Sequence, residues 1–310
     1  MSALLDAMIA GGLVWLAWRS LVGPDLFRAI VTYVVFGLLL AVAWARMGSP
    51  DLAMAEAAIG AGVTGALIMV AYWRLRRIAP IEPAEPSPRR SRLAAVIALL
   101  STGTVTAIGL AAVGALGPGG IAGYALAEAL PTTGLGNPIT GVLVVFRNLD
   151  TVLEMAVLLA AFLAVRAVLG ERGEPLGLPP AQDARLVTAM VTVVAPLSLI
   201  VAIYLLRAGS QLPGGAFQAG ALLAACGVVL VLAGRLRAGA EAGPWVRAGL
   251  VVGTVVFSLV GLAMLAIGQP LLAIPGTWAV YLIEAAMMVS IATTLVLLFA
   301  GAAGLRGGQS

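Results

Sequence analysis

Residues 49–73 carry the stretch that decides the fold of this chain. They read Ser49-Pro50-Asp51-Leu52-Ala53-Met54-Ala55-Glu56-Ala57-Ala58-Ile59-Gly60-Ala61-Gly62 and continue as Val63-Thr64-Gly65-Ala66-Leu67-Ile68-Met69-Val70-Ala71-Tyr72-Trp73. A helix of about 20 mostly apolar residues spans the hydrocarbon core of a bilayer, so the stretch predicts a transmembrane helix. Glu56 lies inside it, where a carboxylate has no water and must be protonated, paired or beside a cavity. This residue is the first indication of a protein that handles ions.

The composition extends that prediction to the whole chain. Of its 310 residues, 61% are hydrophobic and only 10% are charged, and the mean hydropathy is +1.07. Soluble domains do not have this composition, so we expect an all-α, polytopic integral membrane protein. The pI of 9.8 is not a nucleic-acid signal, because the arginines lie in short loops between apolar stretches.

Residues that bind cofactors are nearly absent. The chain has no His, and its single Cys226 lies within an apolar stretch, which excludes an intrachain disulfide. Without such ligands the chain cannot by itself hold haem, an iron–sulfur cluster or structural zinc. We therefore expect no catalytic residue, no metal centre and no cofactor in this chain. The first span has no basic flank before it, which argues against a cleaved signal peptide.

Nine stretches are long and apolar enough to cross a bilayer. They are residues 3–21, 27–46, 50–73, 93–115, 149–169, 186–207, 214–234, 247–268 and 278–302. Two soluble breaks, at 74–92 and 170–184, group them as three, two and four. The predicted division is a three-helix block over 1–78, a basic cytoplasmic linker over 79–92, a two-helix block over 93–170, a cytoplasmic linker over 171–184 and a four-helix block over 185–310.

The placement of the arginines predicts the orientation. If the basic linker is cytoplasmic and the spans alternate, 15 of the 18 arginines face the cytoplasm, and only Arg46, Arg147 and Arg207 lie on the outer side. Cytoplasmic loops carry an excess of Arg and Lys, so we expect the N-terminus outside and the C-terminus inside the cytoplasmic membrane of a prokaryotic cell.

One segment does not fit a plain loop. Residues 116–148 contain Gly117-Pro118-Gly119-Gly120, Glu128, Pro131 and an apolar run from Ile139 to Phe146. Irregular backbone at membrane depth is tolerated only where protein buries it. We expect a re-entrant or surface-lying piece that packs on partner subunits.

The acidic residues collect near the outer face. On this threading, six of them lie about 0–12 Å below that face on helices that enter from it: Asp6, Asp51, Glu56, Asp150, Glu154 and Glu284. For Asp51 and Asp150, stabilisation of a helix N-terminus is as good an account as function. Glu56 and Glu284 lie too deep to be caps, which favours a functional role.

Glu154 lies one turn beyond Asp150, and Arg147 lies three residues before Asp150. The three share a helix face if the helix extends back that far. Either a structural ion pair or a charge-tuned proton or cation site accounts for them. The candidate ion-path residues are therefore Glu56, Glu154, Glu284, Asp51, Asp150 and Arg147.

A glycine-rich stretch precedes the seventh span. It reads Gly209-Ser210-Gln211-Leu212-Pro213-Gly214-Gly215-Ala216-Phe217-Gln218-Ala219-Gly220. Glycines allow a tight turn and a helix start with free backbone amides, so Pro213, Gly214 and Gly215 form a predicted structural loop. Gly249 and Gly253 are spaced for close helix packing, and Met287 and Met288 are predicted core residues.

Three stretches together resemble the Mrp-type multisubunit cation/proton antiporters and the related membrane-bound hydrogenases. Residues 24–73 resemble the hydrogenase D subunit, which is equivalent to a C-terminal part of the antiporter A subunit, through Pro24-Asp25-Leu26-Phe27-Arg28-Ala29 and the stretch quoted first. Residues 137–169 resemble the hydrogenase E subunit through Asn137, Val144-Val145-Phe146-Arg147-Asn148-Leu149-Asp150-Thr151 and Glu154. Residues 185–305 resemble the antiporter B subunit through Pro213-Gly214-Gly215-Ala216-Phe217-Gln218-Ala219-Gly220.

The chain also departs from these families. The third block usually has a His just before Pro-Gly-Gly, and a third Gly where Ala216 stands, whereas this chain has no His. A proton relay through that His is absent here or uses Gln211 or water instead. The large antiporter-like subunits use buried Lys–Glu pairs, and this chain has no Lys.

The resemblance implies an accessory ion-translocation subunit rather than an enzyme. Its acids would hold Na⁺ or K⁺ and H⁺ at the outer entrance and pass them to partner membrane subunits, including the large antiporter-like ones, within the lipid bilayer. Two alternatives stay open: a membrane-arm subunit of a complex I-like or hydrogenase-type redox-driven pump, and a purely structural membrane scaffold.

Overall fold

The computed structural model describes residues 2–22, 25–78, 88–115, 120–169, 184–236 and 243–302. These residues form helices and turns, and no strand lies among them. The elements are α1 (Ser2–Val22), α2 (Leu26–Arg46), α3 (Pro50–Ala55), the π-helix η1 (Glu56–Val63), α4 (Thr64–Ile78), α5 (Pro88–Ala115), α6 (Gly120–Ala129), the 3₁₀-helix η2 (Leu130–Thr133), α7 (Pro138–Thr140), the π-helix η3 (Gly141–Phe146), α8 (Asn148–Leu169), α9 (Ala184–Ala208), α10 (Ala216–Leu232), α11 (Pro244–Ala266) and α12 (Thr277–Ala302).

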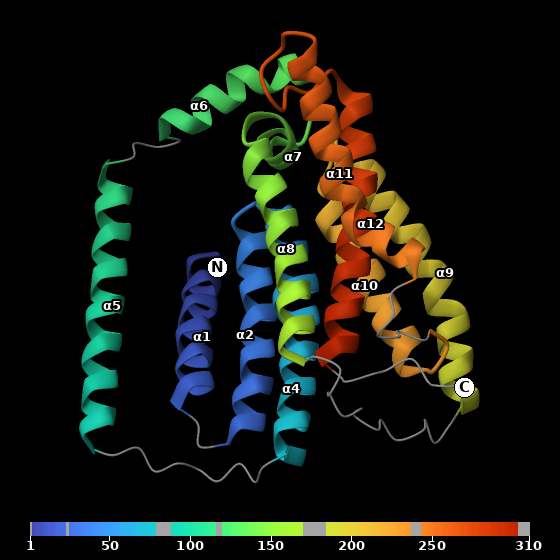
Figure 1. Ribbon diagram of the computed structural model, residues 1–310. Coiled ribbons are helices and arrows are strands. Elements are labelled where there is room, and N and C mark those ends of the chain that lie inside the picture. The colour runs from blue at the N-terminus through green and yellow to red at the C-terminus, as the bar shows by residue number, and fades with distance from the viewer. Residues whose placement is uncertain are drawn as a thin grey trace.

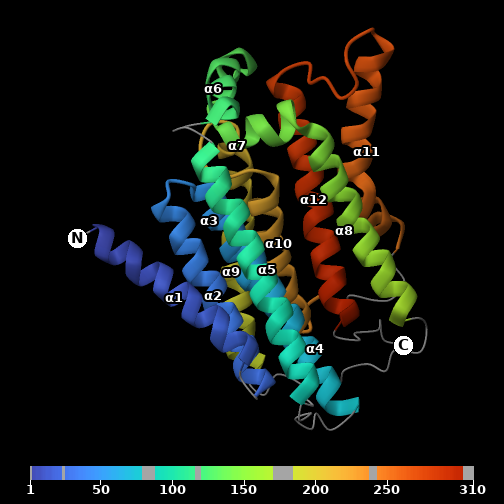
Figure 2. The same ribbon diagram turned by 90° about the vertical axis from the view of Figure 1, so that its left-hand side faces the viewer.

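The long helices run up and down through one slab, as Figures 1 and 2 show. Eight described helices are long and apolar enough to cross a membrane, which confirms the polytopic all-α class. The predicted span at 214–234 is α10, which has only 17 residues and a length of about 26 Å. It is shorter than predicted because a glycine-rich loop occupies residues 209–215, and α10 begins only after it.

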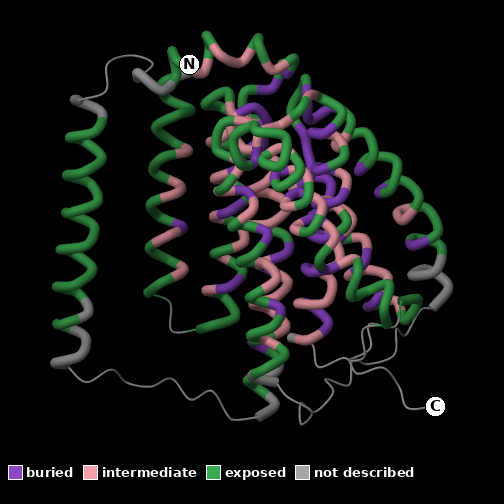
Figure 3. Tube along the Cα trace, turned by 45° about the horizontal axis from the view of Figure 1, so that its top comes forward, coloured by how far each residue is buried: buried purple, intermediate pink, exposed green. Residues whose placement is uncertain are grey.

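The packed core lies around α12, which contacts α8, α9, α10 and α11. Buried residues concentrate there in Figure 3. Gly249 and Gly253 on α11 let it approach α12 closely: a Cβ at Gly253 would lie 3.0 Å from the Cα of Met287. The predicted packing role of these glycines and the core position of Met287 agree with this geometry, since Met287 is only 1% exposed. Met288 packs against the same cluster.

Helix α5 stands apart from the rest of the molecule (Figure 1). Every residue of α5 whose burial is described is exposed, and none of its most apolar window is buried. Its apolar length suits a membrane span, yet its stability within this chain cannot come from packing, because no side chain described on it is covered. The described side chains of α5 are therefore left to the lipid or to other subunits.

The segment between α5 and α8 is bent rather than extended. Gly123–Thr133 and Pro138–Phe146 meet at 94°, which is the geometry of a broken span or a re-entrant loop. The second half packs on this chain itself, with Leu135, Val144 and Val280 in one buried cluster. The expectation that this segment packs on partner subunits is thus incomplete, because its described inner face is covered by the chain's own α12.

The structure gives the helix ends beside the first predicted linker. Helix α4 ends at Ile78, where the predicted three-helix block ends, and α5 begins at Pro88, so residues 88–92 of the predicted linker are helical. Helices extend further here because Arg and Pro are compatible with helix ends, Pro88 being at the first position of α5. The predicted linkers 79–92 and 171–184 otherwise lie mostly outside the described residues.

Candidate ion site

Asp51 is the centre of a buried polar junction. It lies in the first turn of α3 behind Pro50 and is 5% exposed. Its Oδ1 accepts hydrogen bonds from the backbone N–H of Gly214 at 2.9 Å and from Nδ2 of Asn137 at 3.2 Å. Its backbone carbonyl accepts from Nε2 of Gln218 at 3.2 Å. The carboxylate therefore binds donors from two other segments, which stabilisation of its own helix end does not explain.

The loop between α9 and α10 takes its shape from glycine. Gly214 and Gly215 have φ values of +157° and +113°. A Cβ at Gly214 would clash with the carbonyl oxygen of Leu205, and one at Gly209 would clash with the backbone of Gly215. A side chain does not fit at Gly209 or Gly214, and the loop brings the amide of Gly214 to Asp51 and the amide of Ala216 to Glu284. Pro213 is exposed.

The bent segment before α8 covers this loop. The carbonyl oxygen of Ser210 accepts from the backbone N–H groups of Gly136 and Asn137, at 3.0 and 3.2 Å. Oγ1 of Thr140 donates to the carbonyl oxygen of Gly209 at 2.6 Å. These bonds satisfy polar groups that would otherwise be orphaned at membrane depth.

Gln211 is the candidate replacement for the missing His. Its Nε2 donates to the carbonyl oxygen of Gly134 at 3.0 Å, and the residue is exposed. This bond joins the loop to the covering segment, so Gln211 has a structural contact on the outer side of the junction rather than a contact with its carboxylates.

Glu284 reaches the same loop from α12. It is 4% exposed, and the backbone amide of Ala216 at the start of α10 hydrogen-bonds its carboxyl group. Its Oε2 is buried and has no hydrogen-bond partner among the described residues. Asp51 lies close enough for an electrostatic interaction with it. The fold thus brings Asp51 and Glu284 together from opposite ends of the chain.

Two further groups surround the outer side of Glu284. The hydroxyl of Tyr281, one turn earlier on α12, hydrogen-bonds Oγ of Ser210 at 2.5 Å. The guanidinium of Arg207 lies 4.8 Å from the centre of the Tyr281 ring, which is a cation–π distance. An arginine and a tyrosine therefore stand between Glu284 and the predicted outer surface.

Glu56 lies one turn below the junction, at the start of the π-helix η1. It is half-buried, and its carboxylate folds over Gly60, where an added Cβ would clash with its Oε1. Among the described residues it has no hydrogen-bond or ion-pair partner. The sequence predicts a continuous α-helix over 50–73, whereas the structure has a π-helix at Glu56–Val63. The small residues of the Gly60-Ala61-Gly62 run are the available signal for irregular winding.

Asp150, Glu154 and Arg147 lie apart from the junction. The guanidinium of Arg147 pairs with Asp150 at 2.6 Å, and both side chains are partly or largely exposed. The helix does not extend back to Arg147, because η3 ends at Phe146 and α8 begins at Asn148. Glu154 is exposed on α8. The structure therefore supports the ion pair and leaves Glu154 facing the surroundings of the chain.

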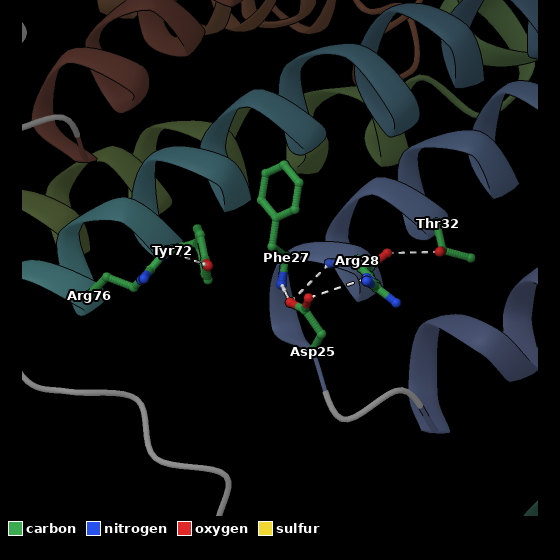
Figure 4. A network of polar contacts seen from close by, with 6 residues as sticks. All are labelled: Asp25, Phe27, Arg28, Thr32, Tyr72 and Arg76. Carbon is green, nitrogen blue, oxygen red and sulfur yellow. Dashed lines mark hydrogen bonds and ion pairs between the residues drawn. The ribbon is translucent and has the colours of Figure 1, made fainter.

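Asp6 forms another ion pair, with Arg46, at 2.8 Å between α1 and α2, on the side that the arginine distribution predicts to be outer. At the opposite end of the bundle, Asp25 caps α2 by accepting the N–H of Phe27 at 2.9 Å (Figure 4). Nearby on α4, Arg76 donates to the hydroxyl of Tyr72 at 3.3 Å. Among the residues that the structure describes, this basic and aromatic network has no contact with the carboxylate junction, and its composition suits a membrane–water interface.

Asn137 and Gln218 are junction residues that the sequence analysis did not single out as site residues. Both are buried and both donate to Asp51. They stand inside motifs that carry the family resemblance, and an uncharged amide at membrane depth is the signal that could have identified them. The arrangement as a whole places two buried carboxyl groups, Asp51 and Glu284, on backbone amides of one glycine-rich loop.

Comparisons with known proteins match the two ends of the chain. Residues 11–77 match the MbhD family model, which describes the D subunit of MBH. Residues 186–305 match the MnhB family model, described as "Domain related to MnhB subunit of Na+/H+ antiporter". The chain therefore has an MbhD-like part and an MnhB-like part. No curated protein matches it significantly.

A solved structure shares the fold. The chain is similar to a chain in the structure titled "Structure of Mrp complex from Dietzia sp. DQ12-45-1b", with a TM-score of 0.78 and 20% identity. The similarity covers 98% of this chain and 35% of that one, so this chain spans about a third of its length. The resemblance of residues 137–169 to the hydrogenase E subunit stays a prediction.

Proposed function

We propose that this chain, which joins an MbhD-like part to an MnhB-like part, is an accessory ion-translocation subunit of an Mrp-type Na⁺(K⁺)/H⁺ antiporter. It would work as a transport subunit in the cytoplasmic membrane of a prokaryote. Its partners would be other membrane subunits of the complex, including large antiporter-like ones. The two family matches, at residues 11–77 and 186–305, support the assignment to an Mrp-type complex.

One observation supports an active role in ion passage over a scaffold. Glu56 is half-buried within a predicted membrane span, and no described residue bonds its carboxylate. A carboxyl group that only holds helices together would have partners, because an uncompensated polar group in hydrocarbon is costly. Glu56 also begins a π-helix, and π-helical turns inside α-helices occur frequently at functional sites.

The substitution Glu56→Gln tests this role. It keeps the shape and hydrogen-bonding capacity of the side chain and removes its charge. We expect the complex to assemble and cation-dependent proton exchange in membrane vesicles to fall at least roughly tenfold, or about 1.4 kcal/mol in the barrier. Glu128→Gln is the matched control, because Glu128 is exposed on α6 and lies outside the junction.

Normal exchange by an assembled Glu56→Gln complex would instead favour the scaffold. In that case the MbhD-like part would have only a structural role, which is to pack against other helices of the complex. Loss of assembly together with exchange would also count against an active role, because the charge would then be needed for packing.

A redox-driven complex is the second candidate, and the match of residues 11–77 to the MbhD family favours it. The redox centres of such a complex would lie in partners, since this chain has no His and one Cys. The neighbouring open reading frames separate the two candidates. Hydrogenase-type or quinone-type genes beside this one would select the redox-driven complex, and antiporter genes alone would select the antiporter.

A further inference from the structure

We propose that Arg76, at the end of α4, binds the phosphate group of an anionic phospholipid. The site lies at the end of the bundle that the arginine distribution predicts to be cytoplasmic, opposite the carboxylate junction. The inference therefore goes beyond the proposed function and does not depend on it. It is carried by an exposed guanidinium that aromatic rings hold in place without a carboxylate partner, and by the positive charge around it.

Aromatic side chains hold the guanidinium of Arg76. Its Cζ lies 5.8 Å from the ring centre of Tyr72 and 5.8 Å from that of Trp73, which are cation–π distances. Its Nη1 also donates to the hydroxyl of Tyr72 at 3.3 Å. Tyr72 is buried, and its ring centre lies 5.9 Å from that of Phe27 on α2. The guanidinium is thus positioned before a ligand arrives, which lowers the entropic cost of binding one.

No carboxylate among the described residues pairs with Arg76. The acid of this network, Asp25, is engaged elsewhere: its Oδ1 accepts the N–H of Phe27 as the cap of α2, and its Oδ2 lies 3.4 Å from Nε of Arg28. A guanidinium has five N–H donors, and the bond to Tyr72 uses one of those on Arg76. The others can bind two oxygens of a phosphate at once, which is the geometry that guanidinium favours.

Arg76 lies at the height expected for lipid headgroups. It follows the apolar span Pro50–Trp73 by three residues, and Arg28 lies in the first turn of the span Leu26–Arg46. Figure 1 shows α1 and α4 ending, and α2 beginning, at the same end of the molecule. Phe27 and Trp73 are exposed there, and aromatic side chains are enriched at membrane–water interfaces. A phospholipid could therefore place its phosphate at Arg76 and its acyl chains along these rings.

The charge at this end of the bundle favours an anionic headgroup over a zwitterionic one. Figure 4 shows Arg28 and Arg76 on either side of the Phe27–Tyr72 pair, so Arg76 is the direct ligand and Arg28 adds attraction. The three helices and the cap of α2 carry five arginines and one acid here: Arg19, Arg28, Arg74, Arg76, Arg77 and Asp25. Basic clusters at the cytoplasmic end of a span attract anionic lipids.

Native mass spectrometry of the purified full-length chain in a neutral detergent tests the site. The probes are dioleoyl phosphatidylglycerol and dioleoyl phosphatidylcholine, which have the same acyl chains and a phosphate each but differ in net charge. We expect phosphatidylglycerol to bind saturably, with a dissociation constant at least roughly tenfold lower than that of phosphatidylcholine. Inorganic phosphate, added as a competitor, should not displace the lipid, because it has no acyl chains to contact the exposed rings.

Three variants localise the binding. Arg76→Gln should weaken the binding of phosphatidylglycerol at least roughly tenfold, because it removes the charged donors. Arg166→Gln is the matched control and should leave binding unchanged: Arg166 is also exposed and lies 6.0 Å from the ring centre of Phe162, but on α8 and outside the network of Figure 4. Asp25→Asn keeps a capping side chain and removes a negative charge, so it should tighten binding roughly threefold.

Several outcomes would overturn the inference. Equal binding of the two lipids to the wild-type chain would show that only the acyl chains are held. Displacement of phosphatidylglycerol by inorganic phosphate would make this a site for free anions. Equal losses in Arg76→Gln and Arg166→Gln would show a general attraction to basic surface instead of a site at Arg76. If Arg76→Gln does not fold, the comparison of the two lipids on the wild type and the gain in Asp25→Asn still decide the matter.

Discussion

The carboxylate of Asp51 accepts a 2.9 Å hydrogen bond from the backbone N–H of Gly214, which lies 163 residues later in the chain. The first residue belongs to the MbhD-like part and the second to the MnhB-like part. This buried bond, together with the one from Nε2 of Gln218 to the carbonyl oxygen of Asp51, joins two units whose family matches are separate.

Removing this carboxylate should destabilise the chain. Asp51→Ala leaves the N–H of Gly214 and one N–H of Asn137 without an acceptor in a buried place. Each unsatisfied group costs about 1–3 kcal/mol, so we expect the free energy of unfolding to fall by at least about 2 kcal/mol. Asp51→Asn keeps an oxygen acceptor and should lose less than half as much. Denaturation of both variants in detergent measures this, and equal losses would show that the charge rather than the acceptor matters.

Gly60→Ala should impair ion passage without harming assembly. A Cβ at residue 60 would clash with Oε1 of Glu56, so the flexible carboxylate must move away from its present place. We expect cation-dependent proton exchange to fall roughly tenfold, about 1.4 kcal/mol in the barrier, with a normal amount of complex. Gly11→Ala is the control, because a Cβ there meets nothing within 4 Å. Unchanged exchange in Gly60→Ala would mean that the position of Glu56 is unimportant.

The contact of α11 with α12 gives a prediction about stability alone. A Cβ at Gly253 would lie 3.0 Å from the Cα of Met287, and this backbone atom cannot swing aside. Gly253→Ala should therefore lower the free energy of unfolding by about 1–3 kcal/mol through overpacking. Gly103→Ala on α5 meets nothing within 4 Å and should cost nothing. If thermal unfolding shows both variants to be equal, the close approach of the two helices is wrong.

The orientation can be tested with one labelled cysteine. After Cys226 is replaced by Ala, a Cys at Ser87 should be protected from an impermeant thiol reagent on intact cells and should react after the cells are opened. The reason is the arginine distribution, which predicts a cytoplasmic linker between α4 and α5. Reaction from outside would invert the threading and would place Asp51, Glu56 and Glu284 on the cytoplasmic side.

Hydropathy predicted the long helices well, because membrane spans are set mainly by apolar length. Hydropathy could not reveal the π-helix at Glu56–Val63, and the small residues of Gly60-Ala61-Gly62 are only a weak signal for it because they are also compatible with α-helical winding. The candidate acids were predicted from depth alone, and depth does not decide which of them meet. Asp51 and Glu284 come to the same loop because each binds one of its backbone amides, Gly214 and Ala216 respectively, whereas Glu154 is exposed on α8. Such contacts depend on tertiary packing, which charge and periodicity do not encode.

Helix α5 has a consequence for the order in which the protein matures. None of the described side chains of α5 is covered by the rest of the chain. Insertion of α5 into the membrane therefore adds no described side-chain packing to the helices that precede or follow it. The core around α12 can therefore form without α5. In a newly made chain, the described surface of α5 stays exposed after that core has formed. The surface of α5 is therefore available to lipid or to another membrane protein without any rearrangement of the core.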